Sequence, residues 1–322
     1  MLIHAILGQL ASKLEFELQL WRDPMSNNSA ALLTAMRLPF LLLTLAVVLL
    51  GIALATTSTI EVSITNAVLV MCGALTAHIS VNLLNEYQDF HSGLDNLTEK
   101  TPFSGGSGAL IVMPSAARFI GEMTVLFLVI TMVIGLYFAL TIGLPIVLIG
   151  VLGLAIILLY TQWINTKPIL CLFSSGLAFG PLMILGTYYV LTGGVTWAVL
   201  LVALVPFFLT NNLLLINQFP DITPDKSVGR NHFPIKYGIK NSLYVYLAFA
   251  LLAIINTLAI LLSYNFPALA YTTLVPMVIA PVVVLVLMKR ATIMNSIIIA
   301  MAVSVMNAVV SPLLLALAIY LN

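Results

Sequence analysis

The sequence predicts an all-α membrane protein with about nine transmembrane helices. Of its 322 residues, 61% are hydrophobic and 7% are charged, whereas roughly a quarter of an ordinary soluble domain is charged. The apolar residues also form long runs, each able to cross about 30 Å of hydrocarbon at about 1.5 Å per residue. The net charge of +1 gives no support for nucleic-acid binding, which needs a basic face.

The predicted spans follow one another with short interruptions. Several contain Gly or Pro, which membrane bundles tolerate when neighbouring groups satisfy the freed backbone. No soluble segment is long enough to fold alone, so residues 37–322 form one transmembrane domain. The spans lie near residues 38–57, 64–86, 117–140, 143–163, 169–192, 196–217, 241–264, 267–288 and 292–320.

Residues 1–36 stand apart from this pattern as an N-terminal interfacial segment and linker. Residues 2–20 mix apolar side chains with Lys13, Glu15 and Glu17, which is too polar for the core of a signal peptide. We expect an interfacial amphipathic helix there. Residues 23–29 are rich in Pro, Ser and Asn and indicate a turn or linker before the first span.

The distribution of basic residues predicts the orientation. With the N-terminus inside, the alternation of spans places all 12 Lys and Arg residues on one side of the membrane. By the positive-inside rule, this side faces the cytoplasm. We therefore expect an integral, multi-pass protein of the cell inner membrane whose active site faces the cytoplasm.

Two segments are unusually polar, residues 82–108 and 217–238, and each follows an apolar span. In the second, Asn217, Asp221 and Asp225 recur every four residues, so on a helix their side chains would share one face. Prolines at positions 220 and 224 disfavour a regular helix there and predict a kinked or loosened turn.

The first segment repeats the spacing with Asn85 and Asp89. Because two spans that end on the same side place these acids at the same depth, the two sets could face each other across one cavity. Neighbouring carboxylates repel, and a divalent cation between them removes the repulsion. Lysines and an arginine lie in the same segments, which suggests a ligand that carries both metal and anion. Mg²⁺ fits this combination, since it is typically held by one or two carboxylates together with phosphates.

Both segments resemble the paired aspartate-rich motifs of the UbiA superfamily of intramembrane prenyltransferases. The motifs read Asn85-Glu86-x-x-Asp89 with Asp95 downstream, and Asn217-x3-Asp221-x3-Asp225-x3-Gly229-Arg230. Their downstream residues are most similar to the branch that prenylates 1,4-dihydroxy-2-naphthoate in menaquinone synthesis. Glu86 stands where the superfamily usually has Asp. In layout the resemblance covers roughly residues 37–320, so it makes residues 37–322 a transmembrane prenyltransferase domain.

The resemblance implies a UbiA-like bundle around a central cavity with a polar cap on the cytoplasmic side. It implies Mg²⁺-dependent transfer of a prenyl or polyprenyl group from an allylic diphosphate to an aromatic acceptor, most closely 1,4-dihydroxy-2-naphthoate or a related quinone precursor. The lipid bilayer would be both solvent and substrate store. Expected metal ligands are Asn85, Glu86, Asp89, Asp95, Asp221 and Asp225. Expected diphosphate contacts are Asn85, Lys100, Asn217, Lys226, Arg230 and Lys236. Expected catalytic residues are Asp89, Tyr160, Asp221 and Arg230. Aromatic walls are expected from Tyr160, Phe173, Phe179, Tyr188 and Tyr189.

Several alternatives stay open. Tyr160 ends a span and could be an interfacial anchor rather than a neighbour of the reacting carbon. The glycine-rich residues 104–108 could curl around a phosphate or form a mobile lid. An intramembrane terpene cyclase would share the same motifs, whereas an ion-coupled transporter would place its acids near mid-depth. His78 is an ionisable group inside a span and is therefore a candidate functional residue.

Overall fold

The computed structural model describes residues 24–289 and 294–322, and every regular element in these ranges is helical. The expected interfacial helix of residues 2–20 lies outside the described residues. In chain order the elements are α2 (Pro24–Ala35), α3 (Leu38–Thr56), α4 (Ile64–Ser92), η1 (Leu94–Asn96), α5 (Ala109–Val112), η2 (Pro114–Ala116), α6 (Ala117–Ile142), α7 (Leu144–Leu159), η3 (Ile164–Thr166), α8 (Pro168–Leu177), η4 (Ala178–Leu182), α9 (Met183–Thr192), α10 (Trp197–Asn217), α11 (Ile222–Ser227), α12 (Phe233–Ser263), η5 (Ala268–Thr273), α13 (Leu274–Met288) and α14 (Met294–Leu321).

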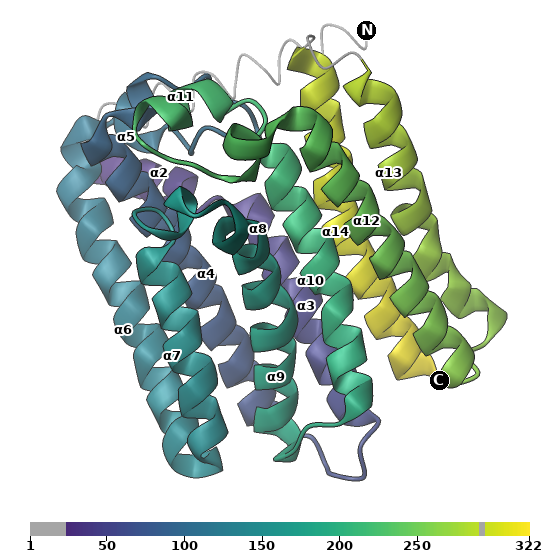
Figure 1. Cartoon of the computed structure of the whole chain (residues 1–322). Coiled ribbons are helices and arrows are strands. Elements are labelled where there is room, and N and C mark those ends of the chain that lie inside the picture. The colour runs from purple at the N-terminus through teal and green to yellow at the C-terminus, as the bar shows by residue number, and fades with distance from the viewer. Residues whose placement is uncertain (1–23, 290–293) are drawn as a thin grey trace, which may run out of the picture.

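In the described part of the chain, eight helical segments are long and apolar enough to cross a membrane, and α7 is a shorter apolar helix. The predicted class, an all-α membrane protein with about nine spans, is confirmed. The long helices run side by side, with α6 and α7 at one edge and α12 to α14 at the other (Figure 1). The largest buried apolar cluster joins α3, α9, α10 and α14 at the centre, through residues such as Leu50, Ile184, Leu209 and Leu315.

One span is interrupted by a π-helical turn, η4, which contains Pro181 and links α8 to α9. A π turn inside an α-helix frequently occurs at a functional site. Here it coincides with close packing against α10, because a Cβ on Gly180 would lie 2.6 Å from the carbonyl oxygen of Ala203. The turn carries Phe179, which lines the cavity described below.

Two predicted boundaries, those of α4 and α12, change in ways that affect the site, whereas α10 ends where it was predicted to end. α4 continues to Ser92 instead of ending near residue 86, so the first motif lies on a regular helix. α10 ends at Asn217, and the chain turns through residues 218–221 before α11 begins. This confirms the loosened turn expected from its prolines. α12 begins at Phe233 instead of 241, with a non-helical break at Gly238 (φ 80°, ψ 165°).

The linker expected over residues 23–29 is wrong from position 24 onward, because α2 begins at Pro24. Proline is favourable at the first position of a helix, where its missing N–H is not needed. The helix packs on α4, α5 and α6 and so belongs to the bundle.

Charged side chains gather at one end of the bundle. Three of the 12 basic residues, Lys13, Arg22 and Arg290, lie outside the described part of the chain. Following the alternating spans places the other nine at the end that carries α5 and α11 (Figure 1). Among the described acidic residues, Glu61 alone lies at the opposite end. The polar cap expected from the sequence is therefore present.

Candidate functional site

A cavity of about 620 Å³ runs from this polar end into the apolar bundle. On α4 its lining extends from Val70 to Asp89, which at about 1.5 Å per residue corresponds to roughly 28 Å of depth. Met132 on α6 and Val151 on α7 line the cavity and are also exposed on the outer surface. The cavity therefore reaches the lipid-facing surface of the bundle, as well as the polar end.

One face of α4 supplies a polar stripe to the cavity. His78, Asn82, Asn85 and Asp89 all line it, and their spacing of four, three and four residues places them on one helical face. The Asn85 side-chain amide donates to Asp89, which fixes the orientation of that carboxylate. The stripe runs from the middle of the span to the polar end.

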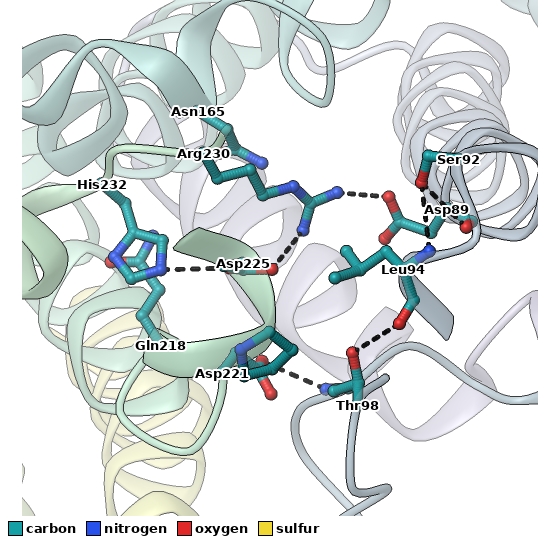
Figure 2. A network of polar contacts seen from close by, with 12 residues as sticks. Asp89, Ser92, Leu94, Thr98, Asn165, Gln218, Asp221, Asp225, Arg230 and His232 are labelled. Carbon is teal, nitrogen blue, oxygen red and sulfur yellow. Dashed lines mark hydrogen bonds and ion pairs between the residues drawn. The ribbon is translucent and has the colours of Figure 1, made fainter. Parts of the chain in front are cut away.

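Arg230 joins the two polar segments (Figure 2). One terminal nitrogen of its guanidinium contacts Asp89, and the other lies 3.0 Å from Asp225 Oδ1. The second oxygen of Asp225 is 3.0 Å from His232 Nε2. The carboxylates of the two motifs thus face each other across the cavity with one arginine between them.

A glycine-rich loop, residues 104–108, borders the cavity at the polar end and leads into α5. Glu86 holds it from the α4 side, since its two oxygens accept from the backbone N–H groups of Ser107 (2.9 Å) and Leu110 (3.2 Å). Asp221 Oδ2 holds the other side by accepting from Gly105 N–H at 3.2 Å. Gly106 has φ +73°, and a Cβ on it would lie 2.8 Å from Asp95 Oδ1, so only glycine fits there.

Eight of the expected site residues line the cavity and four do not. Glu86 is 2% exposed and is turned toward the loop instead of the cavity. Lys100 lies 2.5 Å from Asp95 and also donates to the Gly105 carbonyl. Lys226 and Lys236 are exposed on the surface. The lining residues are Asn85, Asp89, Asp95, Tyr160, Asn217, Asp221, Asp225 and Arg230.

Only two of the five expected aromatic wall residues line the cavity. Tyr160 and Phe179 line the cavity, whereas Phe173, Tyr188 and Tyr189 are not among its lining residues. Tyr188 instead packs in the central apolar cluster. The remaining walls are mostly aliphatic side chains and glycines of α4, α6, α7 and α9.

The sequence reasoning missed Arg37. It stands in a left-handed conformation (φ 53°, ψ 52°) between α2 and α3, lines the cavity and interacts electrostatically with Asp89, Asp95 and Asp221. The sequence identifies Arg37 only as one of the basic residues that predict the orientation in the membrane. Nothing local in the sequence separates it from the surface lysines.

Burial disfavours the charged forms of the acidic groups at the polar end. Burial, and then the charge of Asp225, raise the pKa of Asp221 to about 7. Burial also raises the pKa of Asp95, although its hydrogen bond with Lys100 opposes the rise. The pKa of Tyr160 is well above its usual value because the phenol is buried, so the side chain is a neutral hydrogen-bonding group.

The donor set fits Mg²⁺. Three buried oxygens of lining residues, Asp95 Oδ2, Asn217 Oδ1 and Asp221 Oδ1, have no hydrogen-bond partner. Across residues 24–289 and 294–322, no group of three His, Cys, Asp or Glu side chains is arranged to hold a metal by itself. Mg²⁺ takes oxygen ligands and is usually shared with the phosphates of a substrate, so the three unpartnered oxygens are of the type it binds.

Fold and site together define a class of polytopic membrane protein in which a carboxylate-rich end closes an otherwise apolar cavity. A sequence profile of the UbiA prenyltransferase family matches residues 44–296, and the chain belongs to this family.

Individual relatives agree with this assignment. The chain is similar to 1,4-dihydroxy-2-naphthoate octaprenyltransferase of Bacillus subtilis, at 29% identity over 167 residues. That match covers 51% of this chain and spans about half, 52%, of the relative.

Solved structures share the fold. A UbiA homolog from Aeropyrum pernix K1 has a TM-score of 0.64 at 17% identity, covering 87% of this chain and 96% of its own. A UbiA homolog from Archaeoglobus fulgidus, bound to GPP and Mg²⁺, has a TM-score of 0.60 at 15% identity, covering 91% and 100%. At identities this low, the structural likeness establishes a common helical architecture alone.

The contacts of Glu86 predict that it orders the loop. Glu86→Gln replaces one acceptor oxygen with an NH₂ group, so one of the two loop N–H groups loses its partner at a cost of about 1–3 kcal/mol. Amide hydrogen exchange across residues 104–110 should accelerate about tenfold or more. Glu99→Gln is the matched control, because Glu99 is an exposed acid in the same connection. Equal exchange in the two variants would contradict this role.

Proposed function

We propose that the protein transfers a prenyl or polyprenyl group from an allylic diphosphate to an aromatic acceptor, with 1,4-dihydroxy-2-naphthoate or a related quinone precursor as the acceptor. One observation carries the proposal. Carboxylates from α4 and α11 meet at Arg230, at the polar end of a long apolar cavity. A prenyl diphosphate has the same polarity, with a highly charged head and a long apolar tail.

The head would lie at the polar end. Asn85, Asp89, Asp95, Asp221 and Asp225 would hold Mg²⁺, and Glu86 is omitted because both its oxygens bind the loop. When bound, Mg²⁺ neutralises negative charge on the departing diphosphate.

The chain's own cations would bind the phosphate oxygens. Arg230 and Arg37 both line the cavity, and the planar guanidinium suits bidentate contacts with phosphate. Because Arg230 is held by Asp89 and Asp225, its guanidinium is fixed in place at the polar end of the cavity. Such preorganised donors stabilise a leaving group as its charge develops.

The apolar part of the cavity would protect the reactive carbon. The allylic carbon–oxygen bond breaks with its electron pair going to the diphosphate, and the carbon then bonds to the electron-rich ring, which loses a proton. Tyr160 and Phe179 both line the cavity, where aromatic faces attract a developing cation and aliphatic neighbours exclude water. The acceptor ring is then the available nucleophile.

The comparisons support both substrates. The Bacillus subtilis relative is named for 1,4-dihydroxy-2-naphthoate, and the Archaeoglobus fulgidus neighbour contains GPP and Mg²⁺. A cyclase would share the diphosphate site but would need no aromatic acceptor, so the products distinguish the two activities.

The test is incubation of the purified protein with Mg²⁺, prenyl diphosphates of several lengths and a panel of aromatic acids and phenols, analysed by mass spectrometry. We expect a prenylated aromatic product that disappears with excess chelator and returns with Mg²⁺. Full turnover in chelator would contradict the metal site. A cyclised hydrocarbon formed without acceptor would replace the transferase proposal with the cyclase.

The two motifs should contribute jointly. If one preorganised carboxylate contact is worth about 3–4 kcal/mol at the ionisation step, Asp89→Asn and Asp221→Asn each lower the rate by about 10² to 10³. Asp221→Asn should leave the melting temperature without Mg²⁺ unchanged or higher, since Asp221 Oδ1 is buried without a partner. Asp89→Asn should lower it modestly because an ion pair with Arg230 is lost.

Glu122→Gln is the control for both, because Glu122 is paired with Arg118 on the exposed surface of α6. Near-normal transfer by either well-folded Asp variant would remove that motif from the mechanism.

We also propose that the polar end faces the cytoplasm of an inner membrane, from the one-sided basic residues. Single cysteines at Ser227, exposed at the end of α11, and at Glu61, at the opposite end, would report it in a background with Cys72 and Cys171 replaced by alanine. On intact cells, a membrane-impermeant maleimide should label position 61 and leave position 227 unlabelled. The reverse pattern would invert the topology.

A further inference from the structure

His78 is a cavity-lining residue that the proposed diphosphate site does not use. It lies 11 residues from Asp89 on the same face of α4, or roughly 16 Å toward the middle of the span. An ionisable side chain at this depth is costly, and such residues usually serve a function. The groups around His78 indicate which function it serves.

The ring of His78 is held on two sides. Nδ1 lies 2.7 Å from Thr44 Oγ1, and Thr44 is fully buried on α3. The ring packs edge to face against Phe179 of the π turn, with centroids 5.0 Å apart. Within the described residues Nε2 has no hydrogen-bond partner, and it is not one of the fully enclosed unsatisfied atoms. Nε2 is therefore the nitrogen through which His78 borders the cavity.

The chemistry of the imidazole restricts the ligand group. The Thr44 hydroxyl can donate to Nδ1 or accept from it, so Nε2 is a donor in the first case and an acceptor in the second. A hydroxyl group on the ligand satisfies either arrangement because it both donates and accepts. A carboxylate satisfies only the first, and a prenyl chain satisfies neither.

The position also excludes the diphosphate as the partner. Seven residues separate His78 from Asn85, or roughly 10 Å along the helix, which leaves room for a ring below the charged head. Phe179 presents an aromatic surface beside the imidazole. Asn82, between the two levels, donates to the Met36 carbonyl at 3.0 Å and so fixes the start of α3, with Arg37 and Phe40, against α4.

We propose that His78 is a specificity-determining residue of the acceptor subsite, where its Nε2 hydrogen-bonds a hydroxyl group on the aromatic ring of the acceptor and Phe179 packs beside that ring. This inference rests on the proposed function and adds where the acceptor lies and which substituent is recognised. Thr44 lies outside the cavity and bonds the imidazole at Nδ1, while Phe179 packs on the ring from another side.

The substitution His78→Asn tests the role of Nε2 separately from that of Nδ1. Asparagine reaches about as far as Nδ1, so it can keep the bond to Thr44 while removing the group at Nε2. We expect the KM for a hydroxylated acceptor to rise about tenfold, the scale of one lost buried hydrogen bond. The KM for the prenyl diphosphate and the melting temperature should stay nearly constant. His78→Gln, which can reach the position of Nε2, should recover part of the acceptor affinity.

Thr44→Val is the matched control, because it removes the bond to Nδ1 and leaves Nε2 in place. It should lower the melting temperature more than His78→Asn does and change the acceptor KM by less than about threefold, which is under 0.7 kcal/mol. If His78 only joins α3 to α4, both variants destabilise the protein and neither shifts the acceptor KM selectively, and the inference is overturned.

An acceptor series completes the test. The series contains 1,4-dihydroxy-2-naphthoate and analogues that lack one or both hydroxyls. The wild type should prefer the hydroxylated ring, and His78→Asn should lose most of that preference. A wild type that prenylates all of them equally would overturn the subsite while leaving the proposed function intact. A wild type that forms no prenylated aromatic product would overturn both.

Discussion

The ion pairs of Arg230 with Asp89 and Asp225 are the interaction on which the polar end depends. Both carboxylates are nearly buried, and a buried charge without a partner is strongly destabilising. One guanidinium compensates both, and in doing so it joins the end of α4 to the segment between α10 and α12. The glycine-rich loop is fastened to the same frame, through Glu86 on one side and Asp221 on the other.

Helix irregularities bring polar atoms to the cavity where regular helices would not. α10 stops at Asn217, and the turn before α11 allows Asp221 and Asp225 to lie beside Asp89 from a different span. The π turn at Pro181 places Phe179 against His78. Each irregularity occurs at a proline, which removes a backbone donor and disfavours helix in the preceding residue.

Much of this arrangement could be predicted from residue spacing, and the remainder depends on side-chain direction. The recurring Asn and Asp residues indicated two facing motifs because period-four spacing fixes a common helical face. Glu86 follows Asn85 directly and so points about 100° around α4, toward the loop. Arg37 reaches the cavity only through a left-handed junction between two helices. Lys226 and Lys236 are also basic residues near span ends, but they lie exposed on the surface, and the sequence does not distinguish the two cases.

The polarity gradient of the cavity has a consequence for how a reaction there would end. In the proposed transfer, the inorganic leaving group is hydrophilic and is released at the charged end, whereas the prenylated ring is oily and can depart past α6 and α7, where lining residues such as Met132 and Val151 are exposed. The two products thus partition into different phases. Reversal would require both to return to one cavity, one from water and the other from lipid.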